Sequence, residues 1–228
     1  MEPCETYEHD GVTVNIYYDE DPQHANPREM DNVTTFVCWH PDYILGDFQI
    51  RNPEGRGAVE TIFETETGRT SFESMYVLHR YLTLMYGAKR ITPLYLYDHS
   101  GISIRAGSPS PFDSGGWDTT MVGFAFCTEE RINVCCGEGD EYRTDEWIDK
   151  AIQGDVEEYD KYLTGQVYGF VVDEDGPDEE SCWGFLGDDY CKEEANSVAA
   201  YVAKARRAPD RIYVDAVPVE EALYELSH

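Results

Sequence analysis

The residues best suited to chemistry in this sequence lie at the end of an apolar run. Residues 91–97 are rich in Leu and Tyr, and they lead directly into Asp98, His99 and Ser100. A histidine held by a carboxylate can act as a general acid or base, and Asp118 supplies a further carboxylate downstream. One interpretation is therefore a catalytic centre of Asp98, His99 and Asp118, which in its sharpest form is a metal-dependent nuclease.

The same residues are also ordinary turn formers. Asp, Ser and Gly favour turns, and the side chains of three adjacent residues at a strand end point in different directions. Asp113 offers another carboxylate, but the sequence contains no phosphate-binding loop, nucleophile elbow or zinc-ligand spacing that would complete a site. A structural turn is the simpler interpretation, with no catalytic residue, cofactor or metal predicted.

The cysteines show no pairing pattern. Their number is odd and their spacing does not repeat, which predicts reduced thiols. They are Cys4, Cys38, Cys127, Cys135, Cys136, Cys182 and Cys191. A structural zinc held by Cys38, His40 and the 135–136 pair is the less favoured alternative, because no C-x-x-C accompanies them.

Three tryptophans, Trp39, Trp117 and Trp183, lie beside predicted turns. An aromatic side chain at such a place caps a core or lines a binding pocket, and the core is the simpler interpretation. A pocket for a nucleotide signal would also need local positive charge. The bases near candidate loops are Arg51, Arg56, Arg69, Lys89, Arg90 and Arg105.

Parts of the sequence resemble a known family. The segment YLYDHSGI followed by a Trp-Asp turn and VGF is similar to an uncharacterised family of small phage and mobile-element proteins, as are YDKYLTGQVYGFVV and SCWGFLGDDYCKEEA further on. The resemblance covers roughly residues 91–200. It departs at the turn, where the family has Cys-Pro-Trp-Asp-Ser and this chain has Gly115, Gly116, Trp117, Asp118 and Thr119. The resemblance implies a phage setting and no particular activity.

The strongest feature of the composition is its charge. The chain has 46 Asp and Glu against 17 Lys and Arg, a formal net charge of -29. Such a field repels nucleic acid and anionic membranes and attracts basic protein surfaces. The acidity therefore argues against direct nucleic-acid binding and predicts a partner with a basic surface. Solubility and adaptation to high salt are the alternative explanations.

The acids are concentrated in two segments, which are expected to form one continuous acidic face that binds the partner. Its predicted residues are Glu138, Asp140, Glu141, Asp145, Glu146, Asp149, Asp155, Glu157, Glu158, Asp160, Asp173, Glu174, Asp175, Asp178, Glu179 and Glu180. Spread over roughly 10,500 Å² of surface, the acids average about one per 230 Å², whereas B-DNA carries about one phosphate per 110 Å². Imitation of DNA therefore requires clustering.

These observations favour a non-enzymatic, phage-type acidic protein. It would bind a basic surface on a host nucleic-acid-binding or defence protein, as a DNA-mimic anti-restriction or anti-CRISPR-like inhibitor does. The alternative function is a small metal-dependent hydrolase or nuclease, or a nucleotide-binding protein, centred on Asp98, His99 and Asp118. The oligomeric state stays open.

The hydrophobic content of 41% is enough for a packed core. No apolar run approaches the roughly 18 residues of a membrane span, and the N-terminus lacks the basic and apolar regions of a signal peptide. The prediction is a single α+β domain over residues 1–228 in the cytoplasm, the host's if the protein is phage-encoded. Strands in clusters between single helices favour a mainly antiparallel sheet with three to four packed helices.

The pattern of apolar residues predicts the elements. Thr70 and Glu73 form a capping box for a helix that ends before Gly87, and Thr144 caps a second helix within an acidic segment at about 138–163. Strands are predicted at residues 11–18, 33–39, 58–65, 91–97, 121–126, 166–172, 181–186 and 211–217. Helices are predicted at residues 71–86, 189–207 and 220–226. The acidic loop 173–180 joins two strands as a hairpin.

Overall fold

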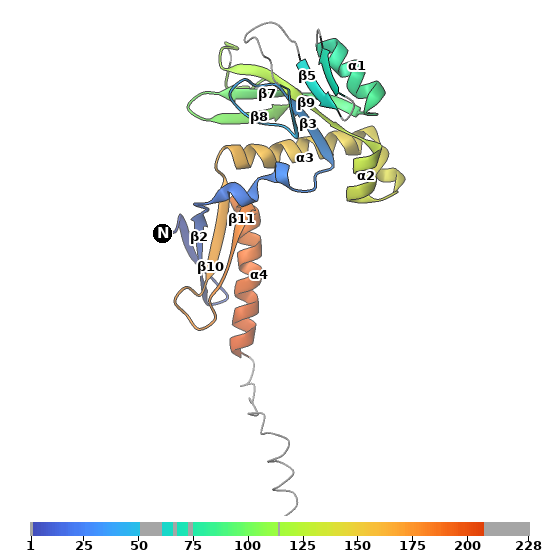
Figure 1. The fold of residues 1–228 in the computed structure, drawn as a ribbon. Helices are drawn as coiled ribbons and strands as arrows, with labels where there is room; N and C mark the ends of the chain where they lie inside the picture. Colours follow the sequence, from blue (N-terminus) through green and yellow to red (C-terminus); the bar gives the residue numbers. More distant parts are fainter. Residues whose placement is uncertain (1, 51–60, 66–67, 73–74, 114, 208–228) are drawn as a thin grey trace, which may run out of the picture.

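The computed structural model describes residues 2–50, 61–65, 68–72, 75–113 and 115–207. It has the predicted α+β architecture, with four α-helices among these residues. The strands form two mainly antiparallel sheets and a separate two-stranded ribbon, whereas the sequence predicted one sheet. Figure 1 shows the two sheets above and below α3.

The larger sheet has five strands in the order β4-β3-β9-β7-β8. Only the β3–β4 pair is parallel. The strands are β3 (Thr34–Cys38), β4 (Phe48–Gln49), β7 (Lys89–Asp98), β8 (Ile102–Ala106) and β9 (Thr119–Cys127). The apolar run that precedes Asp98 is thus an inner strand, β7, and the reactive residues lie where it ends.

A helix covers each face of the five-stranded sheet. Successive strand residues point to opposite faces, so β3 sends Phe36 to one side and Val37 to the other. Val37 packs with Leu78 and Leu82 of α1 (Met75–Met85). Phe36 packs with the buried side of α3 (Asp145–Leu163), whose apolar residues Ile148, Ile152, Val156 and Tyr159 recur at helical spacing.

The smaller sheet has four antiparallel strands in the order β1-β2-β10-β11. They are β1 (Glu5–His9), β2 (Val12–Tyr18), β10 (Val167–Val172) and β11 (Glu180–Leu186). Asp10 and Gly11, with φ of 54° and 81°, form the tight β1–β2 turn, which suits a two-residue hairpin loop. The helix α4 (Asp188–Arg207) packs against Val14, Ile16 and Phe170 on one face of this sheet.

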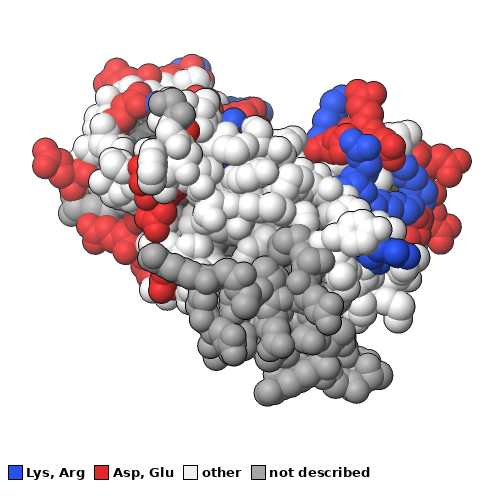
Figure 2. Space-filling model, turned by 90° about the horizontal axis from the view of Figure 1, so that it is seen from above, with Lys and Arg blue, Asp and Glu red and all other residues white. Residues whose placement is uncertain are grey.

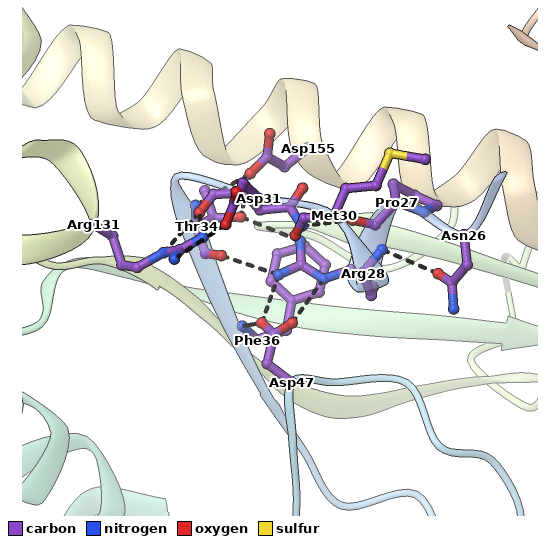
Figure 3. Close-up of polar contacts among 11 residues, drawn as sticks. Asn26, Pro27, Arg28, Met30, Asp31, Thr34, Phe36, Asp47, Arg131 and Asp155 are labelled. Carbon is purple, nitrogen blue, oxygen red and sulfur yellow. Dashed lines mark hydrogen bonds and ion pairs between the residues drawn. The ribbon is translucent and has the colours of Figure 1, made fainter. Parts of the chain in front are cut away.

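The two sheets are joined by a short linker and by α3. The linker contains the 3₁₀ turns η1 (Pro22–Ala25) and η2 (Pro27–Glu29). Within it, Arg28 lies with its guanidinium 3.8 Å from the ring centroid of Phe36 and forms an ion pair with Asp47 at 2.5 Å (Figure 3). The Arg28 side chain is only 6% exposed. Arg28 also donates to the carbonyl of Thr34 at 3.0 Å, and this contact fixes the linker to the start of β3.

Several predicted elements need correction. The helix predicted at 71–86 begins at Met75, because residues Gly68–Phe72 pair as strand β6 with β5 (Thr61–Thr65). Thr70 therefore lies in a strand, and Glu73 is outside the described residues, as are the elements predicted at 211–217 and 220–226. The strands β1 and β8 and the helix α2 (Glu129–Cys136) were not predicted. The hairpin of β10 and β11 and the Thr144 cap are confirmed.

Candidate functional site

The turn after β7 brings the three predicted catalytic residues to one corner of the larger sheet. Nδ1 of His99 lies 3.1 Å from Oδ2 of Asp118, and Asp98 accepts a hydrogen bond of 3.3 Å from the hydroxyl of Tyr43. The side chains of His99 and Asp118 are 63% and 42% exposed. An imidazole held at one nitrogen by a carboxylate can exchange protons through the other, so the corner has the elements of an acid–base pair.

Asp113 has a structural role in the neighbouring turn. Its carboxylate accepts hydrogen bonds from the backbone N–H groups of Trp117, Asp118 and Thr119 at 3.1, 2.9 and 2.8 Å. Burial raises the pKa of Asp113, but these hydrogen bonds outweigh burial and the pKa is lowered. The carboxylate is therefore committed to the turn, which holds Trp117 with 90% of its surface exposed.

The residues suggested for zinc are engaged in other contacts. Nδ1 of His40 accepts hydrogen bonds from the backbone N–H groups of Asp42 and Tyr43, and its ring stacks on Tyr43. Cys38 is fully buried, and that burial raises its thiol pKa well above the usual range. Within the described ranges, no group of three or more His, Cys, Asp or Glu is placed to hold a metal ion. All seven cysteines are free thiols in the structure.

The three tryptophans do not share a pocket. Trp39 packs edge-on against Phe124 and donates from Nε1 to the carbonyl of Met121 at 3.2 Å, so it belongs to the core of the larger sheet. Trp117 is in the turn described above, and Trp183 lies on the smaller sheet. Among the bases suggested for a nucleotide pocket, Lys89 and Arg90 pair with acids.

Two of the predicted partner-binding acids on α3 hold the fold together. Asp155 accepts hydrogen bonds from the backbone N–H and the hydroxyl of Thr34 at the start of β3 (Figure 3). Asp160 accepts a hydrogen bond of 2.8 Å from the backbone N–H of Ile104 on the edge strand β8. An edge strand has unpaired N–H groups, and Asp160 satisfies one of them. Neither carboxylate is free to bind a partner.

The solvent side of α3 is partly neutralised. Arg90 binds Asp149 with two nitrogens and lies 3.6 Å from Asp145, and Lys150 binds Glu146 at 2.8 Å. A shallow hollow of about 560 Å³ on this side is lined by Glu146, Asp149, Lys150, Gln153, Gly154 and Glu157. Within the described part of the chain, the side chains of Glu138, Asp140, Glu141, Glu157 and Glu158 have no hydrogen bond or ion pair.

The acidic loop 173–180 is tied to the end of α4 and to β2. Arg206 binds Asp173 and Asp178, and this contact lowers the pKa of Asp173. Oε2 of Glu174 accepts hydrogen bonds of 2.5 Å from Nδ2 of Asn15 and 2.6 Å from the hydroxyl of Tyr17. Glu179 accepts one from the backbone N–H of Asp175. The loop is thus ordered around its own carboxylates.

The structure does not bring the two acidic segments onto one face. The loop 173–180 lies at the end of β10 and β11 far from α3, at the opposite end of the smaller sheet (Figure 1). Strand β10, which follows α3, separates the two segments. The expectation of a single continuous acidic surface is therefore not met.

Instead, the loop meets acids from the N-terminus. The N–H of Asp173 donates to the carbonyl of Thr13, and Thr13 pairs with Glu8 on β1. Arg207 donates to the carbonyl of Asp10 in the β1–β2 turn. We call the resulting cluster the acidic tip; it consists of Glu8, Asp10, Glu174, Asp175, Glu179 and Glu180. Sequence reasoning missed Glu8 and Asp10, although the absence of any Lys or Arg before Arg28 was a visible signal.

The charge is uneven between the two halves of the molecule. Residues 1–21 and 167–207, which build the smaller sheet and α4, contain 17 Asp and Glu against four Lys and Arg. Seen from above, bases gather on one side of the molecule beside acids, and most acids on the opposite side have no base next to them (Figure 2). On the larger half, for example, the acid Glu129 is paired with two bases, Lys89 and Arg143. Per residue, the smaller half therefore has the larger excess of acids over bases.

Among the residues that the structure describes, none of the helices combines the length and the hydropathy that a membrane crossing requires. Comparison with protein-family models, with curated proteins and with solved structures finds no match for this chain.

Proposed function

We propose that this protein is a non-enzymatic acidic protein of phage type that binds a basic surface on a host protein. The resemblance of residues 91–200 to phage proteins supports a phage setting, in which the chain would act in the host cytoplasm. The charge supports the mode of binding, because a net of -29 attracts basic surfaces and repels nucleic acid.

The observation that carries this proposal is that Lys and Arg side chains pair with acids within the fold. Among the residues that the structure describes, eight Lys and Arg side chains form ion pairs with acids of the same chain. They are Arg28, Lys89, Arg90, Arg131, Arg143, Lys150, Lys192 and Arg206. The bases therefore stabilise the fold locally and leave other acids uncompensated. Like charges crowded at one place destabilise a fold, so an uncompensated cluster suits a surface whose partner supplies the opposite charge.

The acidic tip is the best candidate for the contact surface. Its acids come from two hairpins at the same end of one sheet, and Arg206 holds the loop 173–180 in place. A rigid, preorganised surface loses less conformational entropy on binding than a flexible one. The clustering of acids at the tip supports imitation of DNA, and we assign the target to the class of host nucleic-acid-binding or defence proteins with a basic groove.

The test compares two variants with the same loss of charge. The tip variant combines Glu8→Gln, Asp10→Asn, Asp175→Asn and Glu180→Gln. Asn is used at positions 10 and 175 because their φ is positive and Asn tolerates that conformation. The control combines Glu138→Gln, Asp140→Asn, Glu157→Gln and Glu158→Gln on the α3 side. A partner captured from host lysate is purified, and its affinity for each protein is measured at about 50 and 200 mM salt, with and without competitor DNA.

We expect the tip variant to bind at least about tenfold more weakly, with a shallower dependence on salt, and the control to change much less. DNA should compete with the wild type. A stronger effect of the control would move the contact surface to α3. Equal affinities for all three proteins, or simultaneous binding of DNA, would overturn the proposal.

A second candidate function is favoured by one observation, the 3.1 Å contact between His99 and Asp118. It is a hydrolase or nucleotide-binding protein in which His99 acts as the base and Asp98 and Asp118 orient it or the ligand. His99→Ala should then abolish turnover of a phosphodiester or nucleotide substrate and leave the melting temperature unchanged. Turnover that persists in His99→Ala would exclude this candidate.

A further inference from the structure

The face of the smaller sheet opposite α4 carries an aromatic and carboxylate cluster. Residues of β2 that point away from α4 include Asn15 and Tyr17, whereas Val14 and Ile16 point toward it. Gly169 pairs with Tyr17 on one side and with Trp183 on the other, so the two aromatic residues flank a glycine in one row across the sheet. The ring centroids of Tyr17 and Trp183 are 5.9 Å apart.

Gly169 allows the Trp183 ring to lie directly on the sheet. A side chain at this position would overlap the six-membered ring of Trp183, so only glycine leaves the room. One side of the indole is thus covered by the backbone of β10, and Trp183 still exposes 37% of its surface. An indole that packs on the sheet and still exposes part of its surface can serve as a platform for a planar group.

Glu174 supplies a fixed negative charge beside this platform. Its Oε2 receives two hydrogen bonds, from Asn15 and from the Tyr17 hydroxyl, so the carboxylate and Trp183 both contact the same tyrosine. Within the described chain, Oε1 of Glu174 receives no hydrogen bond. Burial, and then the hydrogen bond to Glu174, raise the pKa of Tyr17 to about 12.

We infer that Trp183 and Glu174 form a binding site for an arginine side chain of the basic partner. The inference rests on the proposed function, of which it defines one anchor point. A guanidinium is planar and permanently charged; it stacks on an indole and forms bonds to a carboxylate through the same group. The surrounding half of the molecule, with 17 acids and four bases, provides the matching long-range field.

The geometry favours arginine over lysine for a physical reason. A lysine ammonium is a compact, strongly hydrated charge, and it cannot cover a flat ring and reach a carboxylate with separate donors as a guanidinium does. Glu174 is already oriented by two donors, so little conformational entropy is lost when the guanidinium binds. The site therefore discriminates between the two cationic side chains, which an acidic surface alone would not do.

The experiment uses the full chain and three short peptides. Each peptide has eight residues with blocked ends and alternates Gly with Arg, with Lys, or with citrulline, the neutral analogue of Arg. Affinities are measured at about 50 mM salt for the wild type, Trp183→Phe, Glu174→Gln and the remote control Glu157→Gln. Gln at position 174 keeps an oxygen that accepts from Asn15 and Tyr17, so the cluster stays assembled.

We expect the Arg peptide to bind several-fold more tightly than the Lys peptide, and the citrulline peptide not to bind. Trp183→Phe should weaken the Arg peptide about fivefold and Glu174→Gln about tenfold, with Glu157→Gln near the wild type. The indole N–H signal of Trp183 in two-dimensional NMR, identified by its loss in Trp183→Phe, should shift on addition of the Arg peptide and not of the citrulline peptide.

The outcomes separate this inference from the proposed function. Equal binding of Arg and Lys peptides that is unaffected by Trp183→Phe, but weakened in the tip variant, would overturn the arginine site and leave binding of basic surfaces standing. No binding of either cationic peptide to the wild type would overturn both. If circular dichroism shows that Trp183→Phe is unfolded, the affinity of Glu174→Gln for the Arg peptide, compared with that of Glu157→Gln, decides.

Discussion

Replacing Asp155 and Glu158 of α3 one at a time by Ala tests whether the acids of this helix divide into structural and surface residues. Both changes remove one carboxylate, and both sites lie within the same helix. Asp155 accepts from the backbone N–H and the hydroxyl of Thr34, which is only 2% exposed. Glu158 is exposed. Only the Asp155→Ala change leaves a buried donor without its acceptor.

The expected cost follows from the contacts that are lost. Hydrogen bonds to a charged acceptor contribute about 1.5–3 kcal/mol, and a buried N–H left unsatisfied costs about 1–3 kcal/mol. Ala favours the helix over Asp by about 0.6 kcal/mol, which offsets part of this loss. The net loss for Asp155→Ala is about 2 kcal/mol. Glu158→Ala should change the free energy of unfolding by less than about 0.5 kcal/mol.

Urea unfolding followed by circular dichroism at pH 7 measures both variants. For a chain of this size, about 2 kcal/mol corresponds to a fall in the melting temperature of roughly 4–8 °C. The double variant Asp155→Ala with Thr34→Ala should lose less than the sum of the two single changes, because the residues share one contact. Equal urea midpoints for Asp155→Ala and Glu158→Ala would refute the reasoning, since the tertiary contact of Asp155 would then contribute nothing.

Two further predictions concern the linker and the smaller sheet. Arg28→Leu should lower the free energy of unfolding by about 3 kcal/mol, measured in urea, because it leaves Asp47 without its buried partner. Adding Asp47→Asn to this variant should recover part of the loss. An unchanged urea midpoint in Arg28→Leu would show that the ion pair does not stabilise the fold. The Tyr17 pKa of about 12 lies above its unfolded value of about 10, so the stability it contributes is complete below pH 10 and is lost as the pH rises toward 12. The urea midpoint should therefore fall more steeply between pH 10 and 12 in the wild type than in Tyr17→Phe, and parallel pH profiles would show that Tyr17 is not perturbed.

The elements that the sequence predicted well are those defined by local patterns. The Thr144 cap and the apolar residues from Ile148 to Tyr159 predict α3, and turn residues between two β-favouring runs predict the β10–β11 hairpin. Elements that depend on partners were missed. Residues Glu5–His9 of β1 are polar and become a strand by pairing with β2, and residues Gly68–Phe72 pair with β5 although their capping residues favour a helix start.

The candidate site was predicted in part. The sequence placed Asp98, His99 and Asp118 in adjoining turns, and the structure brings His99 and Asp118 into contact. It also selected the loop 173–180, which is part of the acidic tip. The platform of Trp183 on Gly169 could not be predicted, because the pairing register of β10 with two different strands places these residues in one row with Tyr17.

The sequence by itself determined the sign and amount of charge, the absence of bases before Arg28, and the helices and strands with strong periodicity. Only the tertiary structure decided which acids are free. A carboxylate is neutralised or satisfied by a group within a few ångströms, and such groups come from distant positions: Asp155 contacts a residue 121 positions away, and Arg90 lies 59 positions from Asp149. The spacing of acids along the chain fixes none of these contacts, because Coulomb attraction and hydrogen bonding depend on distance in space.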